Sequence, residues 1–410
     1  MKISLSIQRV FLALTLFNTL AASFIWGVNT LFLLDAGLTN LEAFAANAFF
    51  TLGQVIFEVP TGIIADTLGR RVSYLLGTVT LALSTILYLY AWKIHAPFWV
   101  WTATSVFLGL GFTFFSGATE AWLVDALNFT KFKGSLESVF AKGQIVGGVA
   151  MLTGSVLGGL VAQYTNLGVP YILRALLLGI TFIVAFLFMK DLGFNPKRSK
   201  NVLKDTKKIL TTSINLGLKK PSIRWVMLEA PFSVGVSFYA FYAMQPYLLK
   251  LYGDPHAYGV AGLAASIVAA SQIAGGLAVP FIKRLFKRRT SILILSVAVN
   301  SLLLFSLGFV GSFPLAIMIL VVWGLLFAAR MPVRQAYLNN LIPSQQRATV
   351  LSFDSLMGSS GGVLIQPVLG KVADLYNYPL SYIGGAVFQI IALPFVLLAR
   401  KENSKADSQD

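Results

Sequence analysis

Long apolar runs separated by short polar loops limit what this 410-residue chain can fold into. Each run has about the 20 residues that an α-helix needs to cross the hydrocarbon core of a bilayer. Hydrophobic residues make up 56% of the sequence and charged residues 12%. A water-soluble fold could not bury so much apolar surface. The pattern predicts an all-α integral membrane protein with about twelve transmembrane helices.

The Lys and Arg residues that give the formal net charge of +16 lie largely in the loops between these runs. Lys and Arg gather at Arg70 and Arg71, at Lys131 and Lys133, and in the stretch 283–289, whereas the alternate loops hold few cations. Cationic loops stay on the cytoplasmic side of a membrane. The charge therefore predicts topology, with both termini in the cytoplasm, and does not indicate a nucleic-acid partner.

Composition divides the chain into two apolar halves. We expect a six-helix bundle over 1–190, a basic cytoplasmic linker over 191–222, a second six-helix bundle over 223–400 and a cytoplasmic tail over 401–410. The first helix is expected over 11–34 and the fourth over 98–127. The second should open at Thr39, because Thr39 and Glu42 have the spacing of a capping box.

Short matches relate the two halves. Gly109 matches Gly324 at an offset of 215, Val156 matches Val368 at 212, and Gln54 matches Gln272 at 218. Matches in one order at nearly one offset indicate a duplicated six-helix unit. Such repeats let a transporter open a central site to each side in turn.

The loop after the second helix carries Gly62, Asp66, Gly69, Arg70 and Arg71. Their spacing, Gly-x-x-x-Asp-x-x-Gly-Arg-Arg, resembles the signature loop of the major facilitator superfamily of secondary transporters. The resemblance implies two six-helix pseudo-repeats. It also implies a conformational latch in which the loop links to an acidic residue at the end of the fourth helix, where Asp125 stands.

Two carboxylates are candidates for proton coupling. Glu58 lies on one helix face with Asn47, Thr51 and Gln54, and it precedes Asp66 by eight residues, about 12 Å along a helix. An ionised carboxylate at that depth must be paired, protonated or hydrated. Glu120 in the fourth helix is the second candidate. The alternative for Glu58 is a structural tie to another helix.

Polar and aromatic residues on several helices are candidates for a substrate cavity, with helix packing as the alternative. They are Asn18, Trp26, Asn29, Gln54, Tyr239, Tyr242, Gln245 and Gln366. Glu229, Arg330 and Arg334 fall in the cytoplasmic third of their helices. They are expected to form an inner gate of ion pairs or to clamp an anionic substrate. Arg174 is expected to be peripheral, because its helix is scaffold in the family.

The fifth helix reads Ala150-Met151-Leu152-Thr153-Gly154-Ser155-Val156-Leu157-Gly158-Gly159. It is similar to the Gly-x-x-x-Gly-Pro-x-x-Gly-Gly motif of the superfamily's antiporters, with alanine in place of the first glycine and serine in place of proline. Small residues at this spacing also allow close helix packing.

Zero cysteines and two histidines leave no metal constellation, and there is no nucleotide-binding loop or catalytic triad. We therefore expect no enzyme and no cofactor, but a monomeric transporter in the cell (inner or plasma) membrane. The main hypothesis is an antiporter for efflux of a small amphipathic or hydrophobic compound, driven by protons. The alternatives are uptake of a small organic anion and a non-transporting sensor or lipid-handling protein.

Overall fold

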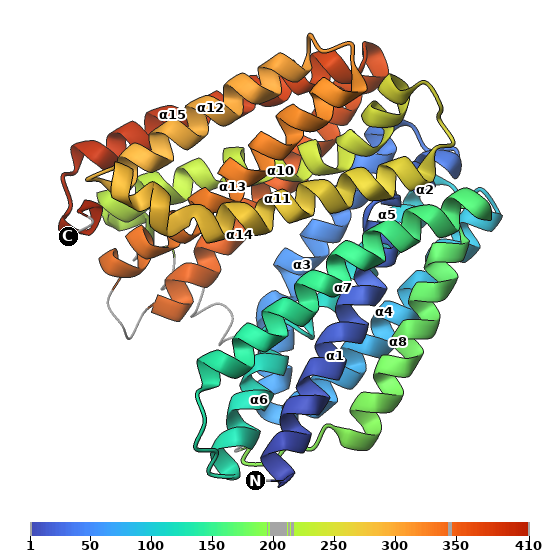
Figure 1. Cartoon of the computed structure of the whole chain (residues 1–410), viewed down its shortest axis with the longest axis vertical. Helices are drawn as coiled ribbons and strands as arrows, with labels where there is room; N and C mark the ends of the chain where they lie inside the picture. Colours follow the sequence, from blue (N-terminus) through green and yellow to red (C-terminus); the bar gives the residue numbers. More distant parts are fainter. Residues whose placement is uncertain are drawn as a thin grey trace. The chain divides into compact units, whose positions relative to one another are not determined.

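The computed structural model describes residues 2–194, 196, 211, 214, 217–342 and 347–408, with backbone only at residues 2 and 347–349. Most of the predicted linker, 191–222, lies outside the described residues. Figure 1 shows long helices throughout. The first eight are α1 (Lys2–Trp26), α2 (Asn29–Asp35), α3 (Asn40–Leu68), α4 (Arg70–Lys93), α5 (Phe98–Thr113), α6 (Ala118–Phe129), α7 (Leu136–Tyr164) and α8 (Val169–Phe188). The later ones are α10 (Pro221–Tyr252), α11 (Tyr258–Leu285), α12 (Arg289–Leu307), α13 (Phe313–Leu341), α14 (Arg347–Leu375), α15 (Tyr378–Lys401) and the short η2 (Lys405–Asp407).

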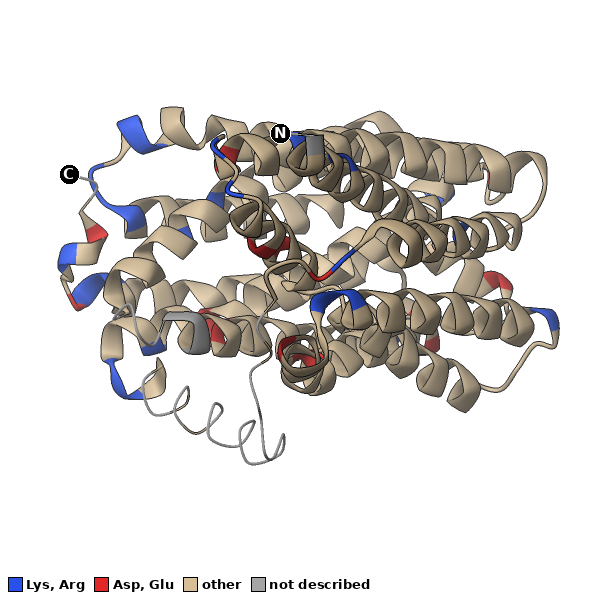
Figure 2. Ribbon diagram, turned by 90° about the horizontal axis from the view of Figure 1, so that it is seen from below, with Lys and Arg blue, Asp and Glu red and all other residues tan. Residues whose placement is uncertain are grey.

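Within the described residues, eleven helical segments are long and apolar enough to cross a membrane, with α5 and α6 counted as one segment. The helix α14 has 29 residues but is not among these eleven. Figure 2 shows that most of the helix length carries neither Lys or Arg nor Asp or Glu. The apolar middle stretches match the hydrocarbon core of a bilayer.

Two helices that we predicted to be continuous are interrupted. The first predicted helix, 11–34, divides into α1 and α2 at Gly27 and Val28. A Cβ on Gly27 would lie 2.9 Å from the Cα of Gly262, so the backbone turns where another helix approaches closely. The fourth, 98–127, divides into α5 and α6, and Gly117 before α6 has a left-handed φ of 66°. The predicted bounds of the first helix were wrong, whereas the fourth span is confirmed, because Phe98–Phe129 forms one candidate membrane span. Apolarity alone does not report the local turn within either segment.

The described helices form two compact units. The first unit comprises Met1–Gly37, Phe49–Thr206 and Ala257–Ser266; in it, α1 packs on α7 and α8, and α4 packs on α5 and α8. The second comprises Leu38–Ala48, Lys207–His256 and Ile267–Asp410; in it, α10 packs on α14 and α15, and α12 packs on α13 and α15. The first turns of α3 thus belong to the second unit, and those of α11 to the first.

The predicted capping box at the start of α3 is confirmed. The Thr39 backbone N–H donates to Glu42 Oε2 at 2.9 Å, and the Glu42 N–H donates to Thr39 Oγ1 at 3.3 Å. These reciprocal bonds satisfy donors that a helix N-terminus leaves free.

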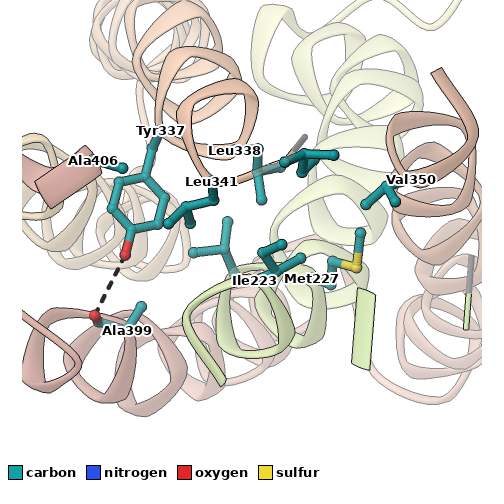
Figure 3. Close-up of a cluster of buried hydrophobic side chains, with 10 residues drawn as sticks. Ile223, Met227, Tyr337, Leu338, Leu341, Val350, Ala399 and Ala406 are labelled. Atoms are coloured by element: carbon teal, nitrogen blue, oxygen red, sulfur yellow. Dashed lines mark hydrogen bonds between the residues drawn. The ribbon is translucent and has the colours of Figure 1, made fainter. Parts of the chain in front are cut away.

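An apolar cluster at one end of the second unit joins several helices to the C-terminal segment. Figure 3 shows Tyr337 and Leu341 of α13 beside Ala399 of α15 and Ala406 of η2. The Tyr337 hydroxyl donates to the Ala399 carbonyl at 3.5 Å. The predicted tail therefore contributes an apolar side chain to this core.

The same tail caps α12. The Asp407 carboxylate is 4% exposed and accepts from the Thr290 backbone N–H at 2.7 Å and from the Thr290 hydroxyl at 2.8 Å. Arg289 Nη1 donates to the carbonyl of Ala406 at 2.5 Å. A carboxylate at a helix N-terminus satisfies free N–H groups and interacts favourably with the helix dipole.

Candidate functional site

The second unit contains a buried group of charged side chains centred on Glu229 of α10. Glu229 is fully buried, and one of its carboxylate oxygens, Oε2, accepts from Arg330 Nη2 and from the Ser233 hydroxyl, the latter at 2.9 Å. The other oxygen accepts from Arg334 Nε at 2.6 Å. The structure therefore brings together Glu229, Arg330 and Arg334, as the sequence suggested.

Asp354 of α14 completes this group. Arg334 Nη1 and Nη2 donate to the two Asp354 oxygens at 2.6 and 2.7 Å, and Nη2 also donates to the Val226 carbonyl at 2.9 Å. Paired donors of a planar guanidinium match a carboxylate well. We call Glu229, Arg330, Arg334 and Asp354 the charge network.

Formal charges in the network cancel, because two carboxylates face two guanidinium groups. Burying four charges is tolerated only where each is paired and hydrogen-bonded. One donor remains open, since Arg330 is 2% exposed and its Nε has no hydrogen-bond partner. The network can thus tie α10, α13 and α14 together, but it presents no net positive charge to a ligand.

The sequence analysis missed Asp354, although a carboxylate inside a long helix of a membrane protein, here α14, is itself a signal of an interior position. It also missed Gln389 of α15, whose Nε2 donates to Ser233 Oγ at 3.3 Å. An amide and a serine are common enough in membrane helices that neither marks a site alone.

Glu58 in the first unit has a different environment. It is half-buried in α3, and Ser116 Oγ, in the break between α5 and α6, donates to its Oε1 at 2.5 Å. No Lys, Arg or His of the described chain forms an ion pair with it within 4 Å. Glu120 lies exposed in the first turn of α6, one turn after Ser116.

The signature loop is held by the segment that follows α8. Asp66 pairs with Arg70 at 2.5 Å, and the Arg71 backbone N–H donates to Asp191 Oδ1 at 2.9 Å. Gly69 has φ 112°, and a Cβ there would lie 2.4 Å from Asp191 Oδ2, so only glycine fits. Gly62 has open space around its Cβ position.

Asp191 contacts this loop directly through its carboxylate, and no sequence pattern predicted this contact. Partial burial raises the pKa of Asp191. The hydrogen bond from the Arg71 N–H and the positive charges of Arg71 and Arg70 oppose this rise in the pKa, whereas the negative charge of Asp125 adds to it. Asp125, the predicted partner, lies nearby, with its backbone carbonyl 2.9 Å from the Cβ position of Gly193.

The predicted cavity residues fall into two groups. The buried ones form hydrogen bonds within their own unit. Asn29 accepts from the Tyr171 hydroxyl at 2.9 Å, and Tyr239 shares a hydrogen bond with Ser381. Gln366 Nε2 donates to the Gly362 carbonyl at 2.9 Å. Gln245 is also buried. Asn18, Trp26, Gln54 and Tyr242 are half-buried. The first group has the environment of helix packing, and the second retains accessible surface.

Arg174 of α8 is not peripheral, contrary to our prediction. It is 2% exposed, its Nε donates to Thr85 Oγ1 at 3.1 Å, and its guanidinium lies 5.8 Å from the Phe112 ring centroid. A membrane-embedded arginine is buried in this way because lipid offers it no partner.

Close helix contacts surround the glycines of α7. A Cβ on Gly158 would lie 1.9 Å from the Phe24 carbonyl oxygen of α1, and one on Gly159 would lie 2.6 Å from the Tyr258 carbonyl oxygen of α11. The motif therefore brings backbones together within the first unit.

Among the described residues, no group of three or more His, Cys, Asp or Glu could hold a metal ion.

Comparison with known proteins identifies the family. The model of the Major Facilitator Superfamily matches residues 11–279 and 230–410. The chain belongs to this superfamily. It is a multi-pass membrane protein of a transport family and not an enzyme.

Superfamily relatives agree with the fold. An uncharacterized MFS-type transporter of Methanocaldococcus jannaschii is 24% identical over 199 residues, which are 48% of this chain and 49% of the relative, so the match spans about half of that protein. The solved nucleoside transporter NupG has a TM-score of 0.77 at 14% identity, over 98% of this chain and 100% of that one. A POT family transporter solved with 5-aminolevulinic acid has a TM-score of 0.74 at 14% identity, over 97% and 96%. At such identities the solved structures show a shared fold alone.

Proposed function

We propose that this superfamily member exports a small amphipathic or hydrophobic compound in exchange for protons, with Glu58 as the proton-carrying residue. In this proposal the protein lies in the plasma membrane. The signature loop and both termini face the cytoplasm. Two six-helix halves, 1–190 and 223–400, alternately expose the substrate site.

The contrast between Glu58 and Glu229 carries this proposal. Glu229 is contacted by two guanidinium groups, which stabilise its ionised form and leave it no role as a proton carrier. Glu58 has a hydroxyl partner and no cation within 4 Å among the described side chains. A carboxylate at membrane depth without a cation gains a proton when water leaves and loses it when water returns.

Neutrality of the charge network supports an uncharged or amphipathic substrate over an anion. An anion bound to Arg330 or Arg334 would have to displace Glu229 or Asp354, each of which would then be buried without its partner. The glycine motif of α7, which resembles that of antiporters, supports the export direction.

Proteoliposomes with an internal pH dye and an imposed pH gradient test the proposal. A panel of amphipathic compounds and organic anions is added one at a time. We expect a compound to trigger proton movement opposite to its own flow, and Glu58→Gln to abolish the proton signal while the protein remains folded. Glu120→Gln tests the second carboxylate. Glu137→Gln, at an exposed site at the start of α7, is the matched control. Full proton-coupled transport by Glu58→Gln would refute the role of Glu58.

A second candidate function, uptake of a small organic anion, has one observation in its favour, the open donor Arg330 Nε. In that case a saturable inward flux of the anion would accompany protons and would be lost in Arg330→Gln. Proton movement with the substrate, or transport without proton movement, would favour this candidate.

A further inference from the structure

Exposed cations gather on the second unit around the start of α12, and we call this group the basic surface. It consists of Arg284 at the end of α11, Lys287 and Arg288 in the loop before α12, Arg400 and Lys401 in the last turn of α15, and Lys405 in η2. Figure 2 shows Lys and Arg segments close to the C-terminus of the chain. The three long helices are all long and apolar enough to cross a membrane, so their ends lie at the level of the lipid headgroups.

The C-terminal segment is fixed to the rest of this surface. Arg288 and Ser408 pair as an isolated antiparallel β-bridge, and Asp407 caps α12 as described above. Lys405 belongs to the same short helix as Asp407. The backbone of Lys405 is therefore held beside the start of α12, where the other cations of the surface lie.

Carboxylates do not neutralise the basic surface. No Asp or Glu of the described chain forms an ion pair within 4 Å with any of its six cations. Glu402 and Asp407 are the only acids of 283–289 and 400–408, and both bond to other groups. Asp407 is buried as the cap of α12, and Glu402 accepts from Trp225 Nε1 at 3.2 Å. The surface therefore has a surplus of positive charge.

The corresponding loop of the first unit has its arginines matched by carboxylates. The helices α3 and α11 start 218 residues apart, and Arg284 follows Asp66 by the same 218. Asp66 pairs with Arg70 in the first unit. Asp191 accepts from the Arg71 N–H there. The preference of cations for cytoplasmic loops accounts for Lys and Arg in both units, but it does not account for carboxylates in only one of the two loops.

An apolar face of α15 leads to the basic surface. Ile390 and Leu397 are exposed, and Lys401 follows them at helical spacing, so all three lie on one face of the helix. In a bilayer such a face contacts acyl chains, while the lysine at its end reaches the headgroups. Acyl-chain contact beside unpaired cations is the complement of an anionic phospholipid.

We infer that the basic surface binds the phosphate group of an anionic phospholipid, whose acyl chains lie along the exposed face of α15. The guanidinium groups offer paired donors to phosphate oxygens, and the lysines add attraction for the negative charge. A free phosphate ion would meet the same cations but would gain nothing from the apolar face. Neither the coupling ion nor the direction of transport enters this inference, so it can fail or succeed apart from the proposed function.

Binding of a fluorescent phosphatidylglycerol to the full-length protein in a neutral detergent, followed by fluorescence anisotropy, tests the inference. We expect this lipid to bind more tightly than phosphatidylcholine with the same acyl chains. The double variant Lys287→Gln/Lys401→Gln should bind it about 25-fold more weakly, because each cation beside an anionic headgroup contributes about fivefold. The matched control, Lys133→Gln/Lys142→Gln, removes two exposed cations from the first unit and should leave the affinity unchanged.

Asp407→Ala separates the arrangement of the cations from their number. This substitution makes the protein more positive by one charge, but it removes the cap that holds η2, and Lys405 with it, against α12. We expect phosphatidylglycerol to bind about fivefold more weakly to this variant. Equal or tighter binding would show that net charge alone attracts the lipid, and it would overturn the inference.

Three further outcomes would also overturn it. They are equal affinity for the two lipids, equal loss of affinity in the two double variants, and competition by inorganic phosphate, at constant ionic strength, that is as effective as competition by unlabelled phosphatidylglycerol. The last outcome would assign the surface to a free anion instead of a lipid.

Discussion

Arg334 of α13 and Asp354 of α14 form a two-pronged ion pair, with both terminal guanidinium nitrogens donating to both carboxylate oxygens. Arg334 is also bonded to Glu229, so one guanidinium joins three helices. Removal of one partner from such a pair leaves a charge buried without compensation, which costs more than the pair itself contributes.

Asp354→Asn is therefore expected to destabilise the second unit by about 3 kcal/mol. Thermal unfolding of the protein in detergent, followed by intrinsic fluorescence, measures the effect. Asp254→Asn, at an exposed loop aspartate, is the matched control and should unfold at the temperature of the unmodified protein. In a double-mutant cycle with Arg334→Gln, additive effects would show that the pair is not coupled.

Gly158→Ala should lower stability and impair transport, because the new Cβ would lie 1.9 Å from the Phe24 carbonyl oxygen and would separate α7 from α1. Gly179→Ala in α8 is the matched control, since no atom lies within 4 Å of its Cβ position. This substitution should be neutral or should stabilise the protein slightly, by about 0.4–1 kcal/mol, which is the usual gain when alanine replaces glycine at a compatible site. Equal unfolding temperatures for the two variants would contradict the close contact.

Asp191 should make stability depend on pH in the acid range. Its pKa is higher in the folded protein than the ordinary value of 3.8, because the carboxyl is partly desolvated. The folded state then binds this proton more readily than the unfolded state, so the contribution of Asp191 to stability is present below pH 3.8 and declines as the pH rises through the folded value.

Asp191→Asn should remove this decline. The unfolding temperatures of the variant and of the unmodified protein are measured from about pH 3.5 to about pH 6.5 and compared. Asp254→Asn serves as a second carboxylate control, because Asp254 is exposed in a loop. A profile of Asp191→Asn that runs parallel to that of the unmodified protein would show that Asp191 does not titrate differently on unfolding.

Asp407→Ala should release the C-terminal segment from α12, since it removes both acceptors of Thr290. The expected loss is that of a helix cap, about 1–2 kcal/mol. Limited proteolysis should cleave the variant near residues 402–408 faster than the unmodified protein. Lys405→Ala, at an exposed position of the same segment, should leave the cleavage rate unchanged.

Features set by local spacing were predictable from the sequence. The Thr39 and Glu42 capping box needs only two residues three apart, and apolar length alone placed most of the membrane-spanning helices. Glu229, Arg330 and Arg334 could be grouped because charges at equal depth in apolar helices must find one another.

Features set by tertiary contact were not predictable. Asp191 reaches the signature loop from 120 residues away, and Asp354 reaches Arg334 from another helix, so neither pairing has a local signal. The breaks at Gly27 and Gly117 depend on backbone conformation that hydropathy does not report. Arg174 was misplaced because a family role for its helix was applied to a residue whose charge required burial.

The cap of α12 has a consequence for biosynthesis. Asp407 follows Thr290 by 117 residues, so α12 emerges from the ribosome long before its capping carboxylate exists. At 5–20 residues per second, roughly 6 to 23 s separate the two events. During this interval the start of α12 must rely on water or on the membrane insertion machinery for hydrogen bonds. Nascent chains arrested before residue 407 would therefore expose an unfinished helix end that cellular quality control could recognise.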